Sequence, residues 1–350
     1  NDSERHWQYP TCFLRFPPKR VGIQISVICY YTKLINSNRT IIEAATMKQM
    51  KQSLGLGLVM MLMWASSLVG AQAQDAPRVR ENFCDGWQFH LGDVPGAEQS
   101  TLDDAAWRTL DVPHDWSIEQ TLDPKTYGGM SVGYLPGGIG WYRKSFTVPK
   151  AAEGKQVFID FDGVYMNSKV WVNGQLLGFR PFGYVGFRYD LTPHLNVGGK
   201  NVIAVQVNVK KGCSRWYPGA GIYRRVWLTT SNPVHVAHWG HFVTTPEVSK
   251  EKASVRLQTE VENNTGKTAA VTLNSVILNP QGKPVATASS TAEIAAGAMY
   301  EFDQNFTVTH PMLWSPDAPD LYKVVTTVET ADNVLDNVTT TLGIRWFEFT

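Results

Sequence analysis

The segment Ser214–Leu228 carries residue types that can bind sugars. Its sequence, SRWYPGAGIYRRVWL, sets four aromatic side chains around a Pro-Gly-Ala-Gly corner and continues into an apolar, β-branched tail. This pattern predicts an aromatic loop held rigidly on a strand. Aromatic faces and planar guanidinium groups are surfaces against which sugar rings can dock. The alternative interpretation is that these aromatic residues belong to the core at a corner of a β-sandwich.

A second candidate for ligand binding is the glycine-rich loop Thr126–Gly140, TYGGMSVGYLPGGIG. Its glycines permit close backbone approach and unusual φ angles, and Tyr127 and Tyr134 can point toward a pocket. The alternative is an ordinary long loop that caps a sandwich.

The acidic residues and histidines do not form a pattern that favours catalysis or metal binding. Asp160 and Asp162 are two residues apart on a predicted strand, so both project from one face, and their strand context favours a structural role. His235, His238 and His241 would share a face on a helix but alternate faces on the strand predicted here. The sequence also lacks a nucleophile elbow, a P-loop and a dinucleotide fingerprint. We therefore expect neither a catalytic residue nor a metal site in this chain.

Short strands are predicted to position these candidates. Before residue 231 the strand patterns fall at Trp141–Val148, Val157–Phe161, Val170–Val172 and Ile203–Val209. In Ile203–Val209, β-branched residues alternate with Ala204, Gln206 and Asn208, which predicts one buried face and one more polar face. Asn173-Gly174 predicts a type I′ hairpin turn.

A second group of strands is predicted after a boundary near Ser231–Pro233. Val255, Leu257, Thr259 and Val261 alternate with polar residues, and further strands are predicted at Val271–Leu278, Tyr300–Val308, Leu321–Glu329 and Asn337–Leu342. About seven short strands in such a length are typical of an immunoglobulin-like sandwich. The chain is therefore predicted to be all-β, with two sandwiches.

The charge balance excludes recruitment of partners by bulk charge. The sequence has 32 Lys and Arg against 31 Asp and Glu, so no strong field favours nucleic acid or an anionic membrane surface.

The N-terminal region predicts export. Lys48 and Lys51 precede the apolar run Leu54–Val69, and Ala71-Gln72-Ala73 follows, which indicates a secretory signal peptide at residues 47–73. An uncleaved anchor is disfavoured because the run is short and interrupted by glycine and serine. Residues 1–46 show no clear period, and we expect them to be doubtful upstream sequence before the start-like Met47. The expected location is periplasmic or extracellular.

Several segments resemble glycoside hydrolase family 2. Those that resemble its sugar-binding domain are PHDWS (113–117), GIGWYRKSF (138–146), FDGVYMNSKVWVNGQLLG (161–178), GYVGFRYDLT (183–192) and SRWYPGAGIYRRVWL. The segments PMLWSPDAPDLY (311–322) and GIRWFEF (343–349) resemble its second domain and the exit from it. The family includes β-galactosidases, β-glucuronidases and β-mannosidases, and this sequence is most similar to the bacterial β-galactosidase branch.

The resemblance implies a domain organisation. Residues 74–230 would form a jelly-roll-like (galactose-binding-like) sandwich, residues 231–343 an immunoglobulin-like sandwich, and residues 344–350 the lead-in to a (β/α)8 barrel that this sequence does not contain. In the family that barrel carries both catalytic carboxylates. The chain is thus expected to be a catalytically silent N-terminal fragment of a secreted, retaining exo-β-glycosidase, foremost a β-galactosidase. The alternatives are a β-glucuronidase or β-mannosidase, a stand-alone carbohydrate-binding protein without catalysis, and a structural or assembly module.

The resemblance also implies a binding position. A loop of the first domain in family members supplies polar groups to the terminal sugar, at a point corresponding to Ser214 or Arg215, where relatives often carry an acidic residue. Trp216 beside them can stack on a sugar, and Tyr134 completes the predicted substrate-binding residues. The expected partner is a β-galactoside or related oligosaccharide, without nucleic acid and without a membrane after signal cleavage. No organic cofactor is expected, while a divalent or monovalent cation and homo-oligomer formation remain open for the full enzyme.

Overall fold

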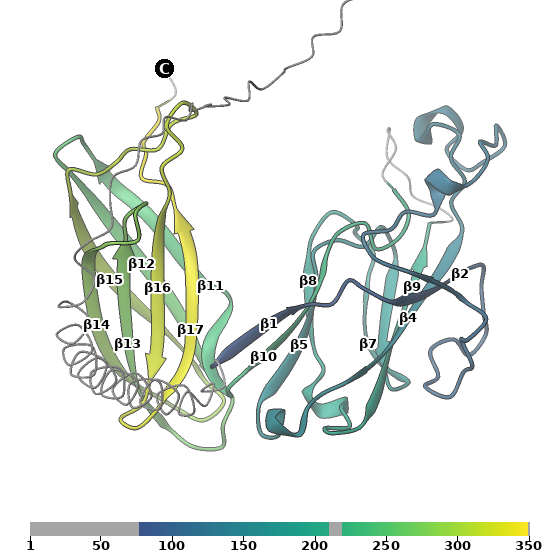
Figure 1. The fold of residues 1–350 in the computed structure, drawn as a ribbon, viewed down its shortest axis with the longest axis horizontal. Coiled ribbons are helices and arrows are strands. Elements are labelled where there is room, and N and C mark those ends of the chain that lie inside the picture. The colour runs from purple at the N-terminus through teal and green to yellow at the C-terminus, as the bar shows by residue number, and fades with distance from the viewer. Residues whose placement is uncertain (1–76, 210–218, 349–350) are drawn as a thin grey trace, which may run out of the picture. The chain divides into compact units, whose positions relative to one another are not determined.

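The computed structural model describes residues 77–209 and 219–348, which lie within one compact unit, Asp75–Thr350. Its paired strands run antiparallel and form two β-sandwiches, coloured blue to teal and green to yellow in Figure 1. The predicted fold class, all-β with a jelly-roll-like sandwich followed by an immunoglobulin-like sandwich, is confirmed.

The first sandwich consists of a four-stranded and a six-stranded sheet. The strand order is β1-β10-β5-β8 in one and β3-β2-β4-β9-β6-β7 in the other. The strands are β1 (Arg78–Asn82), β2 (Trp87–Leu91), β3 (Arg108–Leu110), β4 (Ile139–Thr147), β5 (Gln156–Phe161), β6 (Ser168–Val172), β7 (Gln175–Arg180), β8 (Phe187–Asp190), β9 (Lys200–Asn208) and β10 (Val226–Ser231). Short 3-10 helices in the connections are η1 (Ser117–Glu119), η2 (Gly129–Val132), η3 (Lys150–Ala152) and η4 (Thr192–His194).

The core of this sandwich lies between its two sheets. Ile159 and Phe161 of β5 pack in one cluster with Tyr142 of β4 and Val205 of β9, and each is at most 1% exposed. Burying an apolar side chain of this kind contributes roughly 1.5–3 kcal/mol relative to leaving it exposed. The loops at the ends of the strands are therefore carried by a rigid base.

Strand β9 differs from its prediction because both of its faces are covered at Ala204. This residue is 1% exposed and packs with Ile139, Trp141 and Ala97 in a small cluster separate from the main core. Side chains from the segment between β2 and β3 cover this part of the six-stranded sheet, so a position expected on the more polar face is buried.

The hairpin between β6 and β7 confirms the predicted type I′ turn. Asn173 and Gly174 both have positive φ angles, 49° and 83°, and Val172 pairs with Gln175 across the turn. Positive φ at both central positions matches the right-handed twist of the two strands.

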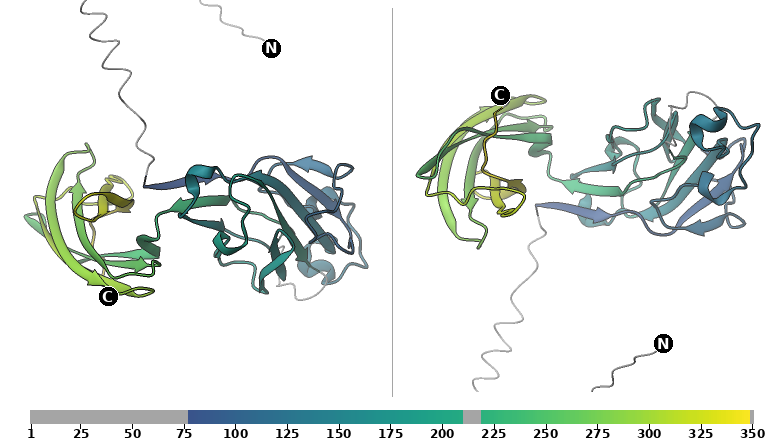
Figure 2. Two further views of the ribbon diagram at one scale, coloured as in Figure 1. Left: turned by 90° about the horizontal axis from the view of Figure 1, so that it is seen from below. Right: turned by 90° about the horizontal axis from the view of Figure 1, so that it is seen from above.

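The second sandwich has a three-stranded sheet, β11-β12-β15, and a four-stranded sheet, β14-β13-β16-β17. Both views of Figure 2 show these strands as one curved group, coloured green to yellow. The strands are β11 (Val234–Val248), β12 (Lys252–Asn263), β13 (Ala269–Leu278), β14 (Pro284–Ile294), β15 (Met299–Thr309), β16 (Tyr322–Glu329) and β17 (Val334–Leu342).

The alternation predicted for β12 is confirmed, since Val255, Leu257, Thr259 and Val261 are at most 1% exposed. Strand β14 was not predicted. Its sequence, PVATASSTAEI, consists mainly of small and polar residues, and it pairs only with β13 at an edge of its sheet. An edge strand needs little apolar surface, so its sequence gives a weak signal.

Candidate functional site

Hydrogen bonds between distant residues tie together the loops at one end of the first sandwich. The Val209 amide donates to the carbonyl oxygen of Gly138 at 2.7 Å, and the Ala220 amide donates to Oδ1 of Asp115 at 3.0 Å. Both flanks of segment 210–218 are therefore fastened to the loop between β3 and β4. The predicted residues Ser214, Arg215 and Trp216 belong to that segment and lie outside the described residues, so their roles remain predictions.

Asp115 joins two parts of this loop cluster through one carboxylate oxygen. Its Oδ1 accepts hydrogen bonds from the amides of Ser117 and Ala220, each at 3.0 Å. Gly219 next to it has a φ of 87°, and a Cβ there would lie 3.3 Å from Oδ2 of Asp115. The backbone can thus come close to the carboxylate because residue 219 is glycine.

Gly221 fixes the corner of the predicted sugar-binding segment. Its φ is 136°, and it exchanges two 2.9 Å backbone hydrogen bonds with Tyr165. A Cβ at this position would overlap the hydroxyl of Tyr142 and approach the carbonyl oxygen of His114 to 2.5 Å. The corner therefore requires glycine, both for its backbone conformation and for space.

A chain of polar contacts leads from the core to the surface beside this corner. Nδ1 of His114 lies 2.8 Å from the hydroxyl of Tyr142, and Nε2 of His114 lies 3.3 Å from Oε1 of Glu119. Arg108 donates two hydrogen bonds of 2.7 Å to Glu119.

The electrostatics of this chain follow from burial and pairing. Burial lowers the pKa of His114 below its ordinary value, although Glu119 opposes the shift. The hydrogen bonds from Arg108 lower the pKa of Glu119. Near neutral pH the imidazole is therefore uncharged and the carboxylate charged, an arrangement suited to holding loops in place.

Tyr134 lies just beyond η2, in the same connection between β3 and β4. Its φ is 59°, its amide donates to the carbonyl of Gly129 at 2.9 Å, and its carbonyl accepts from the amide of Asp123 at 2.9 Å. A left-handed conformation costs a residue other than glycine about 1 kcal/mol or more, so the surrounding loop must enforce it. The side chain is 38% exposed and accessible to a ligand, and its predicted binding role stays a prediction.

A cleft with a volume of about 520 Å³ lies elsewhere, lined by strands of both sandwiches. The first sandwich contributes residues of β1, β5, β8 and β10, and the second contributes residues of β11 and β17. Its charged and aromatic lining includes Arg78, Arg80, Asp160, Asp162, Arg188 and Trp239.

Asp160 and Asp162 both line this cleft, but their partners indicate structural roles. Asp160 is 4% exposed and accepts hydrogen bonds from Arg188 at 2.6 and 3.0 Å and from the hydroxyl of Thr229 at 3.0 Å. Asp162 accepts a 3.0 Å hydrogen bond from the indole nitrogen of Trp227 through Oδ2. Asp160 thus anchors β5 to β8 and β10.

The three histidines of β11 are arranged by a β-bulge. Val236 pairs with Val261 and His241 with Thr259, so residues 237–240 bulge out of the ladder. Because of this bulge His238 and His241 both line the cleft, and the prediction that residues three apart would alternate faces is wrong for this pair.

Each of these histidines has its own neighbour. Nε2 of His235 lies 3.8 Å from Glu262, Nδ1 of His238 lies 3.8 Å from Asp160, and Nδ1 of His241 lies 2.8 Å from the hydroxyl of Thr340.

Burial lowers the pKa of all three histidines. Arg78 adds to this effect at His235 and His241, and Arg188 adds to it at His238, while the pKa of His241 falls to about 4. Near neutral pH these imidazoles are therefore uncharged.

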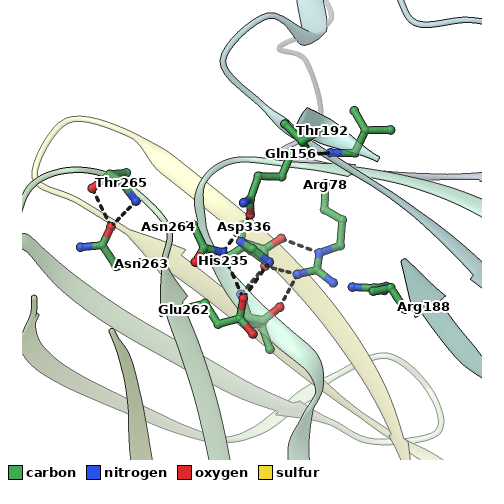
Figure 3. A network of polar contacts seen from close by, with 12 residues as sticks. Arg78, Gln156, Arg188, Thr192, His235, Glu262, Asn263, Asn264, Thr265 and Asp336 are labelled. Atoms are coloured by element: carbon green, nitrogen blue, oxygen red, sulfur yellow. Dashed lines mark hydrogen bonds and ion pairs between the residues drawn. The ribbon is translucent and has the colours of Figure 1, made fainter. Parts of the chain in front are cut away.

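Sequence reasoning missed Arg78 and Trp239. Arg78 donates to both carboxylate oxygens of Asp336, at 2.9 and 2.7 Å, and to the carbonyl of Val236, as Figure 3 shows in part. No local pattern marks an arginine whose partner is 258 residues away. Trp239 is 74% exposed, and the only signal for it was an aromatic residue between His238 and Gly240.

Among residues 77–209 and 219–348, no three His, Cys, Asp or Glu side chains are grouped so as to hold a metal ion. A search of the same residues for a helix long and apolar enough to cross a membrane found none.

Two consecutive antiparallel sandwiches, with a tied loop cluster at one end of the first, define an all-β, two-domain protein. Residues 84–232 match the sugar-binding domain of glycosyl hydrolases family 2, and residues 234–345 match a further domain of the same family. The chain belongs to glycoside hydrolase family 2.

Relatives of the chain include enzymes with different sugar preferences. It is 46% identical over 273 residues to a β-galactosidase of Bacteroides ovatus, covering 78% of this chain and 32% of the relative. It is 32% identical over 299 residues to a β-glucuronidase of Formosa agariphila, covering 78% of this chain and 30% of the relative. The chain thus spans about a third of the length of these curated relatives.

A solved structure of a family 2 glycosyl hydrolase from Bacteroides cellulosilyticus matches with a TM-score of 0.73 and 37% sequence identity, covering 76% of this chain and 35% of that one. A β-glucuronidase of family 2 matches with a TM-score of 0.74 and 31% identity, covering 79% and 31%.

Proposed function

We propose that the full-length protein containing this chain is an exported β-galactosidase that removes terminal β-galactosyl units. The observation that carries this proposal is the 46% identity to the Bacteroides ovatus β-galactosidase across both sandwiches. Under this proposal the chain supplies the sugar-binding and immunoglobulin-like domains.

The proposed contribution of the first sandwich is to position the substrate. The loop cluster fastened by Asp115 and Gly138 holds both flanks of the segment with Ser214, Arg215 and Trp216. Arg215 would donate hydrogen bonds to sugar hydroxyls, and Trp216 would offer its face to sugar C–H groups. Tyr134 would contact the same substrate from the neighbouring loop.

Hydrolysis with retention needs two carboxyl groups about 5–5.5 Å apart, one as acid and base and one as nucleophile. We place these groups in the part of the relatives that this chain does not match. Asp160 is not assigned to catalysis because Arg188 and Thr229 engage its oxygens. The chain by itself is expected to bind sugar without cleaving it.

A β-glucuronidase is the second candidate function. The observation in its favour is the similarity to family members of that name among both curated relatives and solved structures. A glucuronide carries a carboxylate at C6 where a galactoside has a hydroxymethyl group, and its C4 hydroxyl has the opposite configuration. A glucuronidase would therefore need a cationic contact near the sugar C6 position.

The test is to assay the full-length protein with p-nitrophenyl β-galactoside, β-glucuronide and β-mannoside. The proposal expects the galactoside to have the highest kcat/KM, with a product that first appears as the β-anomer. Higher kcat/KM for the glucuronide would favour the second candidate. Hydrolysis of none of the three would favour a carbohydrate-binding protein without catalysis.

Export, cofactor use and assembly belong to the same proposal. The mature protein is expected to begin at Gln74, to need no organic cofactor and to form homo-oligomers. N-terminal sequencing of the native exported protein, assay after exhaustive dialysis, and sedimentation analysis test these three points. A native N-terminus upstream of Met47 would contradict the proposed signal peptide.

A further inference from the structure

We propose that the cleft lined by both sandwiches is a second saccharide-binding site, in which a neutral sugar stacks on Trp239 and hydrogen-bonds Arg80 and Asp162. This site is separate from the loop cluster that holds Tyr134, and it goes beyond the proposed hydrolysis. All three side chains line the cleft of about 520 Å³, which is within the usual size range for small-ligand sites.

Trp239 is displayed by the backbone rather than left exposed by chance. It lies in the bulge of β11 with a φ of 58°, and its side chain is 74% exposed. Bulges re-aim side chains, and a left-handed tryptophan costs about 1 kcal/mol or more unless its surroundings enforce it. Gly240 allows this close turn, because a Cβ there would lie 2.9 Å from the carbonyl oxygen of Glu260.

The indole of Trp239 is also supported from behind. Its ring stacks on the imidazole of His238, with centroids 4.5 Å apart and planes 26° from parallel. His238 in turn lies 3.8 Å from Asp160, which is held by Arg188. An aromatic platform fixed in this way loses little conformational freedom when a ligand binds.

The charges of the cleft are paired so that one donor and one acceptor remain available. Arg78 is bound to Asp336, and Arg188 is bound to Asp160. Arg80 forms no ion pair with any residue in the described ranges, and its guanidinium lies 4.3 Å above the ring of Trp227. Asp162 accepts from the indole nitrogen of Trp227 through Oδ2, and no described residue donates to its Oδ1.

This pattern favours a neutral saccharide over other ligands. The three arginines that line the cleft are offset by two lining aspartates and by the buried Asp336 that pairs with Arg78, so no net charge attracts an anion. A sugar ring presents an apolar C–H face for the indole and hydroxyl groups that accept from Arg80 and donate to Asp162. A protein partner would be expected to cover a larger surface than this small recess offers.

The experiment is a 19F NMR titration of the full chain labelled with 5-fluorotryptophan. The Trp239 resonance is assigned by its absence in Trp239→Phe, and the probe is β-1,4-galactobiose. We expect the Trp239 resonance to shift saturably at millimolar sugar. In Arg80→Met the apparent Kd should rise by about tenfold, the loss expected for a substantial contact.

Phe242→Ala is the matched control, because Phe242 is 62% exposed on the same strand but does not line the cleft. It should leave the Trp239 shift and its Kd unchanged. Tyr134→Ala should also leave the Trp239 shift and its Kd unchanged. A result against the proposed binding site in the loop cluster would therefore not affect this readout.

Three outcomes would overturn the proposal. The first is a Trp239 resonance that does not move up to about 50 mM galactobiose, well beyond weak millimolar binding. The second is a stronger shift with glucuronate, which would indicate an anion site. The third is a Trp239 signal that depends on protein concentration without sugar, which would indicate that a second copy covers the cleft.

Discussion

Arg78, the first residue of β1, forms a two-point ion pair with Asp336 of β17, which is fully buried. The same carboxylate accepts a 2.8 Å hydrogen bond from the amide of Val236 on β11, and Figure 3 shows the guanidinium of Arg78 directed at it. One carboxylate thus connects the first sandwich to two strands of the second. The pair is more than a surface contact because Arg78 is only 17% exposed.

Asp336→Asn should lower the free energy of unfolding by about 3 kcal/mol, because it leaves a largely buried arginine without its counter-charge. Urea unfolding of the full chain measures this loss. Asp303→Asn is the matched control, since Asp303 pairs with Arg256 at 2.6 Å but both side chains are more than 40% exposed. An exposed pair contributes little because solvent screens its charges, so equal losses in the two variants would contradict the assignment.

His241 should make the fold less stable in mild acid. Its pKa is lowered to about 4 by burial and by Arg78, so between about pH 6.5 and pH 4 the unfolded chain binds a proton that the folded chain does not. The free energy of unfolding should therefore fall as the pH drops through this window, by an amount on the order of 3 kcal/mol.

Unfolding in urea at pH 7.5 and pH 5 measures how the free energy of unfolding depends on pH. In His241→Gln the loss on acidification should be smaller, although His235 and His238 leave part of it in place because burial lowers their pKa values too. His310→Gln, at an exposed position, serves as the control. If His241→Gln and the unchanged chain lost the same free energy of unfolding on acidification, His241 would not be the source of the acid sensitivity.

Gly221→Ala should disrupt the corner of the predicted sugar-binding segment. The new Cβ would meet the hydroxyl of Tyr142 and a backbone carbonyl, at a φ that side chains rarely adopt. We expect a loss of at least about 3 kcal/mol from strain and overpacking together, visible as a lower urea midpoint or loss of soluble protein. Gly266→Ala, where no atom lies within 4 Å of the new Cβ, should be tolerated. Equal midpoints in the two variants would contradict the close fit.

Asp115→Ala should weaken substrate binding in the full-length enzyme, because the amides of Ala220 and of Ser117, the first residue of η1, lose a common acceptor. KM for p-nitrophenyl β-galactoside is expected to rise by about tenfold with a smaller change in kcat. Asp115→Asn keeps an oxygen at Oδ1, so KM should rise less in this variant. A KM unchanged in Asp115→Ala would show that these loops do not position the substrate.

Local patterns were sufficient to predict most of the strands and the family. The alternation at Val255 and Leu257 depends only on which face of one strand meets the core, and the turn at Asn173-Gly174 depends only on backbone preferences of two residues. Such signals lie within a few residues of one another, so they can be read from the sequence. The same locality explains the missed strand β14, whose small polar residues bury little at a sheet edge.

Contacts between distant segments had no such signal. The chain itself determined two β-sandwiches, their approximate strands and a glycine corner at Gly221. Only the tertiary structure decided that Arg78 meets Asp336, that Asp115 binds Ala220, and that the bulge of β11 turns Trp239 and His238 into one cleft. The physical reason is that these relationships depend on the register and crossing of strands, which bring together residues far apart in sequence and can reverse the face of a side chain.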